Sequence, residues 1–320
     1  MKKRIFSLFP AVCIIFTILP DLLLPASAKA APDIRVEITE NDGKVSWGEG
    51  DDLSEAVSGT VAGAVYSIEV TYGEITTADW NYIKGNRASF SSLRSFTVAD
   101  AVYTVADMPS GSVSYYPYAV SLFPDSIQSI SIPNVTAIGD YAFWQCENLT
   151  DADLTDVIDI GYGSFNYCIS LTDINIPNAE TIRANAFQRC RALGTINIPA
   201  VEIISNCAFD GCIGLTALNL PSAETIGEYA FYNCTSLITL KLPEVPPTVQ
   251  RDAFAGCPET RRLVFVDANG DELTGDALDD AGAAYKTDDD GSTEDNLWYG
   301  WVIPLDSISL DIGDGDIEAS

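Results

Sequence analysis

The stretch IGEYAFYNCTSLITLKLP, residues 226–243, is one copy of a pattern that recurs through the middle of the chain. Successive copies are 22 residues apart, except that the last spacing is 23, where Pro246-Pro247 adds one residue to a turn. A fixed period of this length is the sequence signature of a repeat architecture. The two most regular columns are a phenylalanine column and a cysteine column: Phe143, Phe165, Phe187, Phe209, Phe231 and Phe254, and Cys146, Cys168, Cys190, Cys212, Cys234 and Cys257.

Each repeat has two halves with different periodicities. In the first half, as in residues 138–146, apolar residues fall at i, i+4, i+5 and i+8, which predicts a short helix or 3₁₀ segment. In the second half, as in Leu171-Thr172-Asp173-Ile174-Asn175-Ile176-Pro177, apolar and polar residues alternate. This alternation predicts a short strand that ends at the proline.

A unit of 22 residues is too small to bury its own apolar side, so the repeats must stack. Stacking pairs the strands into a parallel sheet with rungs about 4.8 Å apart and piles each apolar side chain on its equivalent. The predicted fold is a mainly β α/β solenoid, with a parallel sheet on one face and short helical or 3₁₀ turns on the other.

The consensus I-G-x-x-A-F-x-x-C-x-x-L-x-x-I-x-I-P resembles the BspA-like, or Treponema-type, leucine-rich repeat, and residues 226–237 match it almost completely. Regular copies cover residues 127–265. Ser164 replaces the alanine in one copy, and Arg183, Ser205 and Gln250 replace the glycine in others. The resemblance implies a leucine-rich-repeat fold and a surface-associated role in adhesion or interaction, with matrix proteins or other cells as the class of partner.

The segments on either side of the repeats are irregular. Strand signatures at residues 67–70 and 93–98, together with the repeat strand near residue 131, imply two longer units of 28 and 34 residues. Between the first two strands, Thr76 or Thr77 is expected to cap a helix with Asp79 in its first turn. We therefore assign residues 31–126 to an amino-terminal cap and residues 266–320, which carry 16 acids and one lysine, to an acidic carboxy-terminal cap or tail.

Residues 1–30 have the organisation of a secretory signal peptide. Lys2, Lys3 and Arg4 precede an uncharged apolar run to Pro20, and small residues suited to cleavage follow at residues 26–30. The apolar run has 16 residues, fewer than the roughly 20 that a membrane-spanning helix requires. We expect a protein that is secreted or held at a bacterial cell surface, with no transmembrane segment after cleavage.

The composition excludes several classes of function. The 320 residues include 17 Lys and Arg against 46 Asp and Glu, a formal net charge of −29 that disfavours binding to nucleic acid. The chain has no histidine, which removes Ser-His-Asp catalysis, Cys-His catalysis and every histidine-containing metal site. No enzyme, cofactor or metal is therefore expected. Asp267, Asn269 and Asp271 imitate the start of a calcium loop but lack its later residues, so we interpret them as a turn.

The cysteines are expected to be structural and reduced. Stacked side chains point the same way, which suits packing of small apolar groups better than disulfide bonding. Cys207 lies outside the cysteine column, and we expect it to face outward as the one reactive thiol.

The outward side chains of the predicted strands are the candidate ligand-binding residues. They form two polar columns whose selected members are Ser129, Ser131, Asp151, Asp153, Asp173, Asn175, Thr195, Asn197 and Asn219. One interpretation is a solvated face on which Asn175, Asn197 and Asn219 stack as an amide ladder. The other is a polar, acidic recognition surface for an extracellular protein or glycan.

The predicted function is a secreted or cell-surface binding module that acts through this strand face. Two alternatives remain open from the sequence. One is a structural spacer of a larger envelope polypeptide with no specific ligand. The other is a carbohydrate-active enzyme that uses Asp151, Asp153 or Asp173 as a carboxylate pair.

Overall fold

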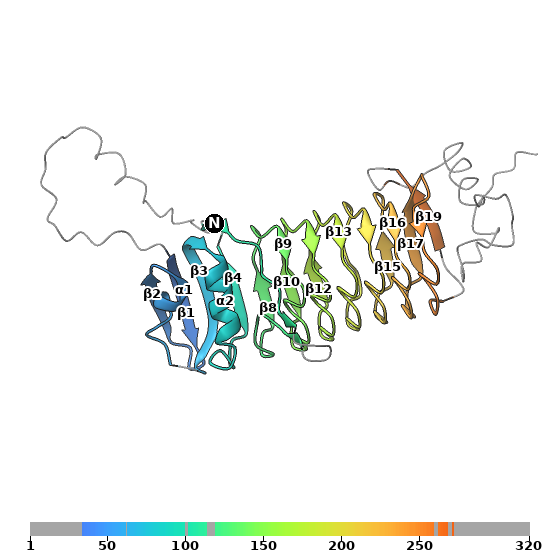
Figure 1. Ribbon diagram of the computed structural model, residues 1–320. Coiled ribbons are helices and arrows are strands. Elements are labelled where there is room, and N and C mark those ends of the chain that lie inside the picture. The colour runs from blue at the N-terminus through green and yellow to red at the C-terminus, as the bar shows by residue number, and fades with distance from the viewer. Residues whose placement is uncertain are drawn as a thin grey trace, which may run out of the picture. The chain divides into compact units, whose positions relative to one another are not determined.

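The structure is a computed structural model that describes residues 34–61, 63–99, 102–113, 119–258, 262–267 and 271 (Figure 1). The predicted signal peptide at residues 1–30 and nearly all of the acidic tail lie outside these residues. No helix among the described ranges is long and apolar enough to cross a membrane.

The first part of the described chain is a mixed α/β unit. Its elements are β1 (Ile34–Glu40), β2 (Val45–Gly50), α1 (Leu53–Ala56), β3 (Val65–Ile75), α2 (Thr77–Gly85), β4 (Ser95–Val98) and β5 (Val102–Val105). β1 pairs antiparallel with both β2 and β3, whereas β4 and β5 pair parallel with β3. The hairpin of β1 and β2 and the short α1 were not predicted from the sequence.

Helix α2 begins as the sequence predicted. The Thr76 side chain accepts a hydrogen bond from the Asp79 amide, and the Asp79 carboxylate accepts one from the Thr76 amide at 2.8 Å. This reciprocal arrangement is a capping box, which satisfies backbone donors that a helix start otherwise leaves unpaired. Asp79 is buried and also accepts a hydrogen bond from the Leu53 amide at 2.8 Å, which ties α1 to α2.

The repeat strands form a parallel sheet in the predicted register. These strands are β8 (Ser129–Ser131), β10 (Asp151–Asp153), β12 (Asp173–Asn175), β15 (Ala217–Asn219), β17 (Thr239–Pro243) and β19 (Arg262–Val266). Ser129 lies opposite Asp151, and Asp151 lies opposite Asp173, so neighbouring strands are offset by one whole repeat. Isolated bridges from Asn197 to Asn175 and from Thr195 to Ala217 carry the pairing across the intervening rung, a rung being one repeat of the stack.

The repeat sheet continues directly into the first part of the chain. β4 pairs parallel with β8 and places Thr97 opposite Ser131, while β3 places Glu69 opposite Thr97. These offsets are the 28 and 34 residues expected from the strand signatures, so that prediction is confirmed.

The second side of each rung differs in detail from the helical segments that the sequence predicted. It carries a second parallel sheet of two-residue strands: β9 (Ala137–Ile138), β11 (Asp159–Ile160), β13 (Thr181–Ile182), β14 (Ile203–Ile204), β16 (Thr225–Ile226) and β18 (Thr248–Val249). A run of turns follows each of these strands in place of a helix. A further short hairpin, β6 (Ser112–Val113) with β7 (Ala119–Val120), precedes the regular rungs.

Left-handed residues explain why these turns do not become helices. Tyr141 (φ 59°) and Gln145 (φ 56°) flank Phe143 in the first regular rung, and the corresponding pairs of positions are left-handed through the rung that contains Phe254. Amides of alternate residues therefore point to the next rung, as from Phe143 to the Ser164 carbonyl at 2.7 Å. The amides between them close turns within the rung, as from Cys146 to the Phe143 carbonyl at 3.0 Å. The apolar residues thus have the spacing of a helix in the sequence, although their backbone forms hydrogen bonds between rungs as in a sheet.

The core of the stack is the phenylalanine column. All six rings are buried, and neighbours lie nearly parallel with centroids 4.9–5.2 Å apart. Phe123 extends the column at 5.3 Å from Phe143 and packs edge-on against Phe96. The column therefore joins the core of the first part of the chain to that of the repeats.

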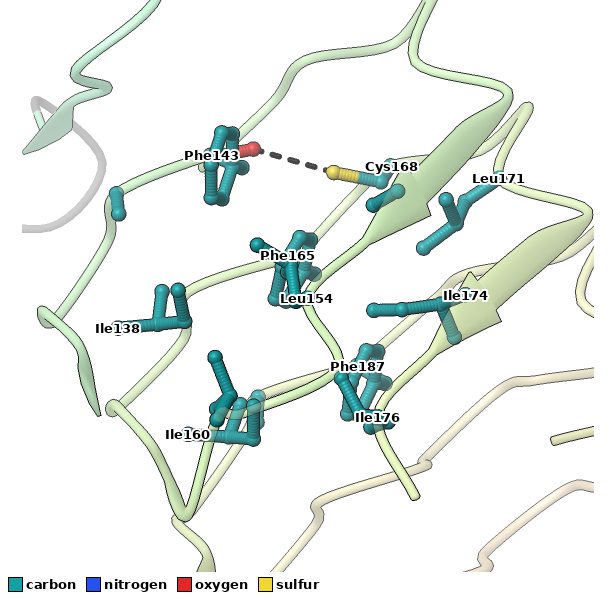
Figure 2. Close-up of a cluster of buried hydrophobic side chains, with 14 of the residues drawn as sticks. Ile138, Phe143, Leu154, Ile160, Phe165, Cys168, Leu171, Ile174, Ile176 and Phe187 are labelled. Carbon is teal, nitrogen blue, oxygen red and sulfur yellow. Dashed lines mark hydrogen bonds between the residues drawn. The ribbon is translucent and has the colours of Figure 1, made fainter. Parts of the chain in front are cut away.

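The cysteine column lies beside the rings and is satisfied by hydrogen bonds. The Cys168 thiol donates to the Phe143 carbonyl of the preceding rung at 3.1 Å, as Figure 2 shows, and the thiols of Cys190, Cys212, Cys234 and Cys257 repeat this contact. The seven cysteines in the described ranges are free thiols. The six cysteines of the column are buried, as expected of cysteines that pack as small apolar groups.

Candidate functional site

The outward side chains of the repeat sheet form two continuous rows. The first, here the serine–aspartate row, runs through Ser67, Ser95, Ser129, Asp151 and Asp173, each opposite the next. The second, here the asparagine row, runs through Glu69, Thr97, Ser131, Asp153, Asn175 and Asn197. Alternation along each strand places these side chains outward, while their neighbours Ile130, Ala152 and Ile174 enter the core.

All nine residues selected from the sequence lie on this face. Asp151, Asp173, Asn175, Thr195 and Asn197 are exposed, and Ser129, Ser131, Asp153 and Asn219 are partly buried. Ser129 and Asn219 lie four rungs apart, about 19 Å at the strand-pairing distance. A ligand that contacts the whole set must therefore be extended.

Hydrogen bonds hold part of the asparagine row in place. The Asp153 carboxylate accepts hydrogen bonds from the Thr155 hydroxyl and from the Asn175 amide, both at 2.8 Å. The Asn175 amide also donates to the Thr155 hydroxyl at 2.9 Å. These three side chains form a small closed network, so their orientation is fixed before any ligand arrives.

The amide ladder considered as one interpretation of this face is wrong. Asn175 donates toward Asp153 on the preceding strand, and the described residues contain no hydrogen bond between asparagine side chains of the row. The side-chain oxygen of Asn219 is withdrawn from solvent without a hydrogen-bond partner. A charged acceptor one rung away competes better for an amide donor than a neutral one does.

The serine–aspartate row carries unneutralised negative charge. Asp151 and Asp173 are exposed and lie directly opposite each other on adjacent strands. Neither takes part in the ion pairs found in the described ranges, and the one hydrogen bond to Asp151 comes from the Thr150 hydroxyl at 3.0 Å. Like charges so placed repel each other, and a cationic partner would relieve that repulsion.

The face extends beyond the residues that sequence reasoning selected. Glu37 on β1 lies opposite Glu69, and Trp47 on β2 lies opposite Glu37, so the asparagine row ends at a tryptophan that is 65% exposed. The alternating residues 34–40 and 45–50 around Asn41-Asp42-Gly43 are a hairpin signal that could have revealed these two strands.

Two hollows among the described residues lie away from the two rows. They have volumes of about 440 and 450 Å³ and are lined by residues 221–224 with 243–248 and by residues 87–91 with 124–126. Within the described ranges no group of three or more histidine, cysteine or acidic side chains is arranged to hold a metal ion. Asp271, one of the residues that imitate a calcium loop, donates its amide to the Asp267 carboxylate at 2.9 Å, as a turn would.

Cys207 is half-buried, unlike the cysteines of the column. Burial is the main cause that raises the pKa of its thiol, and the nearby carboxylates of Asp210 and Glu228 raise it further. A raised pKa lowers the fraction of reactive thiolate near neutral pH. The position thus leaves Cys207 more accessible than the column thiols, while its surroundings reduce its reactivity.

Comparison with known proteins assigns the repeats. The family model described as "BspA type Leucine rich repeat region" matches residues 119–216 and 180–272, with six copies. No curated protein matches the chain. A crystal structure of the Treponema pallidum leucine-rich repeat protein is similar with 21% identity and a TM-score of 0.37, covering 65% of this chain and 78% of that one. A leucine-rich repeat protein from Eubacterium ventriosum shows 24% identity and a TM-score of 0.32, covering 53% of this chain and 39% of that one.

Proposed function

We propose that residues 119–272, which match the family model of a BspA-type leucine-rich repeat region, are an interaction module that binds an extracellular protein or glycan through its strand face. The observation that carries the proposal is the pair of continuous polar rows, in which Asp151 and Asp173 lie exposed and unpaired beside an oriented Asp153–Asn175 network. We further propose that the protein is exported and acts in adhesion at a bacterial cell surface.

The rows suit recognition by many weak contacts. Each rung presents polar side chains at about the 4.8 Å strand spacing, on strands whose opposite side is locked into the core. A rigid face loses little conformational entropy on binding, so small contacts add up more effectively. The acidic character predicts an association that weakens as salt screens the charges.

The test is binding of purified residues 31–320 to a panel of extracellular-matrix proteins and glycans, compared with a triple variant. In this variant Asp151→Asn, Asp153→Asn and Asp173→Asn remove three charges but keep side-chain size and an acceptor oxygen. Loss of saturable binding by about tenfold or more, or some 1.4 kcal/mol, would support recognition on the strand face.

A charge-matched control separates the face from the net charge. Glu147→Gln, Glu180→Gln and Glu202→Gln remove the same three charges from exposed positions outside the two rows. Equal loss in both triple variants would show a nonspecific charge effect and contradict the proposal. Unchanged binding in the strand-face variant would move the site elsewhere, and no binding to any member of the panel would favour the spacer function.

A further inference from the structure

The one irregular spacing in the repeats changes the surface at the corresponding rung. In the preceding rungs the apolar residue in the turn after the strand is buried in every case, at Val135, Val157, Ala179, Val201 and Ala223. After β17, Pro246-Pro247 makes this turn one residue longer, and Val245 is 74% exposed. Exposure of the apolar Val245 side chain to water is unfavourable, so a partner that buries this side chain would gain free energy.

The longer turn lies beside a hollow of about 440 Å³. Pro221, Pro243, Val245 and Pro246 supply apolar walls, and Glu224 and Glu244 supply carboxylates. The proline rings restrict the backbone that carries them, so the hollow exists before any ligand binds. Its size suits one bulky apolar side chain and the polar side chain next to it in a peptide.

This hollow is called the proline hollow below. Its charge determines which kind of partner it favours. Glu224 and Glu244 are exposed, and neither side chain forms an ion pair or hydrogen bond with another described residue. The chain's own residues 266–320 hold 16 acids and one lysine, so repulsion disfavours that segment as the occupant. A cationic partner is favoured for the same reason.

We propose that the proline hollow docks an extended peptide segment of another protein in which an arginine or lysine adjoins a bulky apolar residue. The apolar side chain packs on Val245 and the prolines, and the cation pairs with Glu224 and Glu244. The site is separate from the strand face, so it adds a second contact to the proposed function rather than restating it.

The experiment follows the valine methyl NMR signals of the mature chain during titration with capped peptides. The probe is acetyl-Gly-Arg-Leu-Gly-amide, and the comparison peptides replace arginine by glutamate or leucine by serine. We expect the probe to shift the Val245 methyl signals in a saturable way, and each comparison peptide to bind about tenfold more weakly. No shift with the probe, or equal binding of the glutamate peptide, would overturn the proposal.

Matched variants locate the effect. Glu224→Gln with Glu244→Gln is expected to weaken binding of the probe about tenfold. Glu147→Gln with Glu180→Gln removes the same charge from exposed positions farther from the hollow and is expected to leave binding unchanged. Deletion of Pro246 restores the 22-residue spacing and is expected to abolish binding. Because that deletion can disturb the rung, the variant with Glu224→Gln and Glu244→Gln is the decisive one. Unchanged affinity of this variant for the probe would contradict the proposal.

Two further outcomes are informative. Undiminished binding of the probe to the strand-face triple variant would support a separate site. The proposal for the proline hollow and the proposed function can therefore be contradicted independently of each other. Shielding of the Val245 methyl groups from a soluble paramagnetic agent in the unliganded chain would show that the protein covers the hollow itself, which would overturn the proposal.

Discussion

At the scale of single residues, two left-handed positions recur in every regular rung. One column contains Tyr141, Gly163, Asn185, Cys207, Tyr229 and Asp252, and the other contains Gln145, Tyr167, Arg189, Gly211, Asn233 and Gly256. Glycine and asparagine in these columns signal a left-handed backbone in the sequence. Equivalent positions in other rungs hold tyrosine, arginine or cysteine, which do not indicate a left-handed backbone. The turns were therefore predicted as helical.

Replacing Cys207 tests the strain at one of these positions. A non-glycine residue pays roughly 1–2 kcal/mol for left-handed backbone, which the greater freedom of unfolded glycine partly offsets. We expect Cys207→Gly to raise the free energy of unfolding by about 0.5–1 kcal/mol in urea titrations. Cys207→Val, with a β-branched side chain, should lower it, and a ranking of valine above glycine would contradict this account.

At the scale of elements, the repeat strands were predicted and the first two strands were missed. The alternation around Asp173 set both the strand and its outward side chains, because one buried neighbour on each side determines which face a residue takes. β1 and β2 carry no copy of the repeat, so the period offered no guide to them. The polar network of Asp153, Thr155 and Asn175 was also beyond sequence reasoning, since it depends on side-chain rotamers across a rung.

The packing of α1 on β2 makes a prediction for that hairpin. A Cβ on Gly48 would lie 1.8 Å from the Ala56 carbonyl oxygen, whereas one on Gly85, in α2, would meet no atom within 4 Å. Gly48→Ala should therefore lower the free energy of unfolding by about 2–3 kcal/mol. Gly85→Ala should raise it by about 0.5–1 kcal/mol. Similar stability of the two variants would show that α1 does not pack closely on β2.

At the scale of the whole molecule, the buried thiols link stability to pH. Burial raises the pKa of Cys146 to about 12 from an ordinary value of 9.0, and burial also raises the pKa values of Cys168, Cys190 and Cys212. The unfolded chain therefore loses these protons first as the pH rises. The stabilisation is fully present below pH 9 and declines above it, by about 1.4 kcal/mol per pH unit for each thiol.

Urea titrations at pH 8.5, 9.5 and 10.5 check this dependence. Cys146→Ala should reduce the loss between pH 9.5 and 10.5 by about 1.4 kcal/mol, although the variant starts from a lower stability. Val157→Ala, at another fully buried position without a proton to lose, should keep the original slope. Equal slopes in all three proteins would mean that the thiols ionise in the folded state.

The 28- and 34-residue offsets of the first strands show how far a sequence can predict the whole stack. Those offsets followed from strand signatures alone, because a strand that joins a parallel sheet must keep its outward side chains in step. The proline hollow could not be foreseen, since an extra residue in a turn does not reveal which side chain it expels. The exposed Val245 became visible only in three dimensions.

The backbone bonding between rungs also has a consequence for the gene. Each regular rung donates amides to the next and contacts few others, so duplication or loss of one complete repeat in the coding sequence would join equivalent edges and leave the remaining contacts unchanged. A single added codon, such as the one at the doubled proline, cannot be absorbed in that way. Tandem copying therefore alters the length of the protein, whereas small insertions alter its surface.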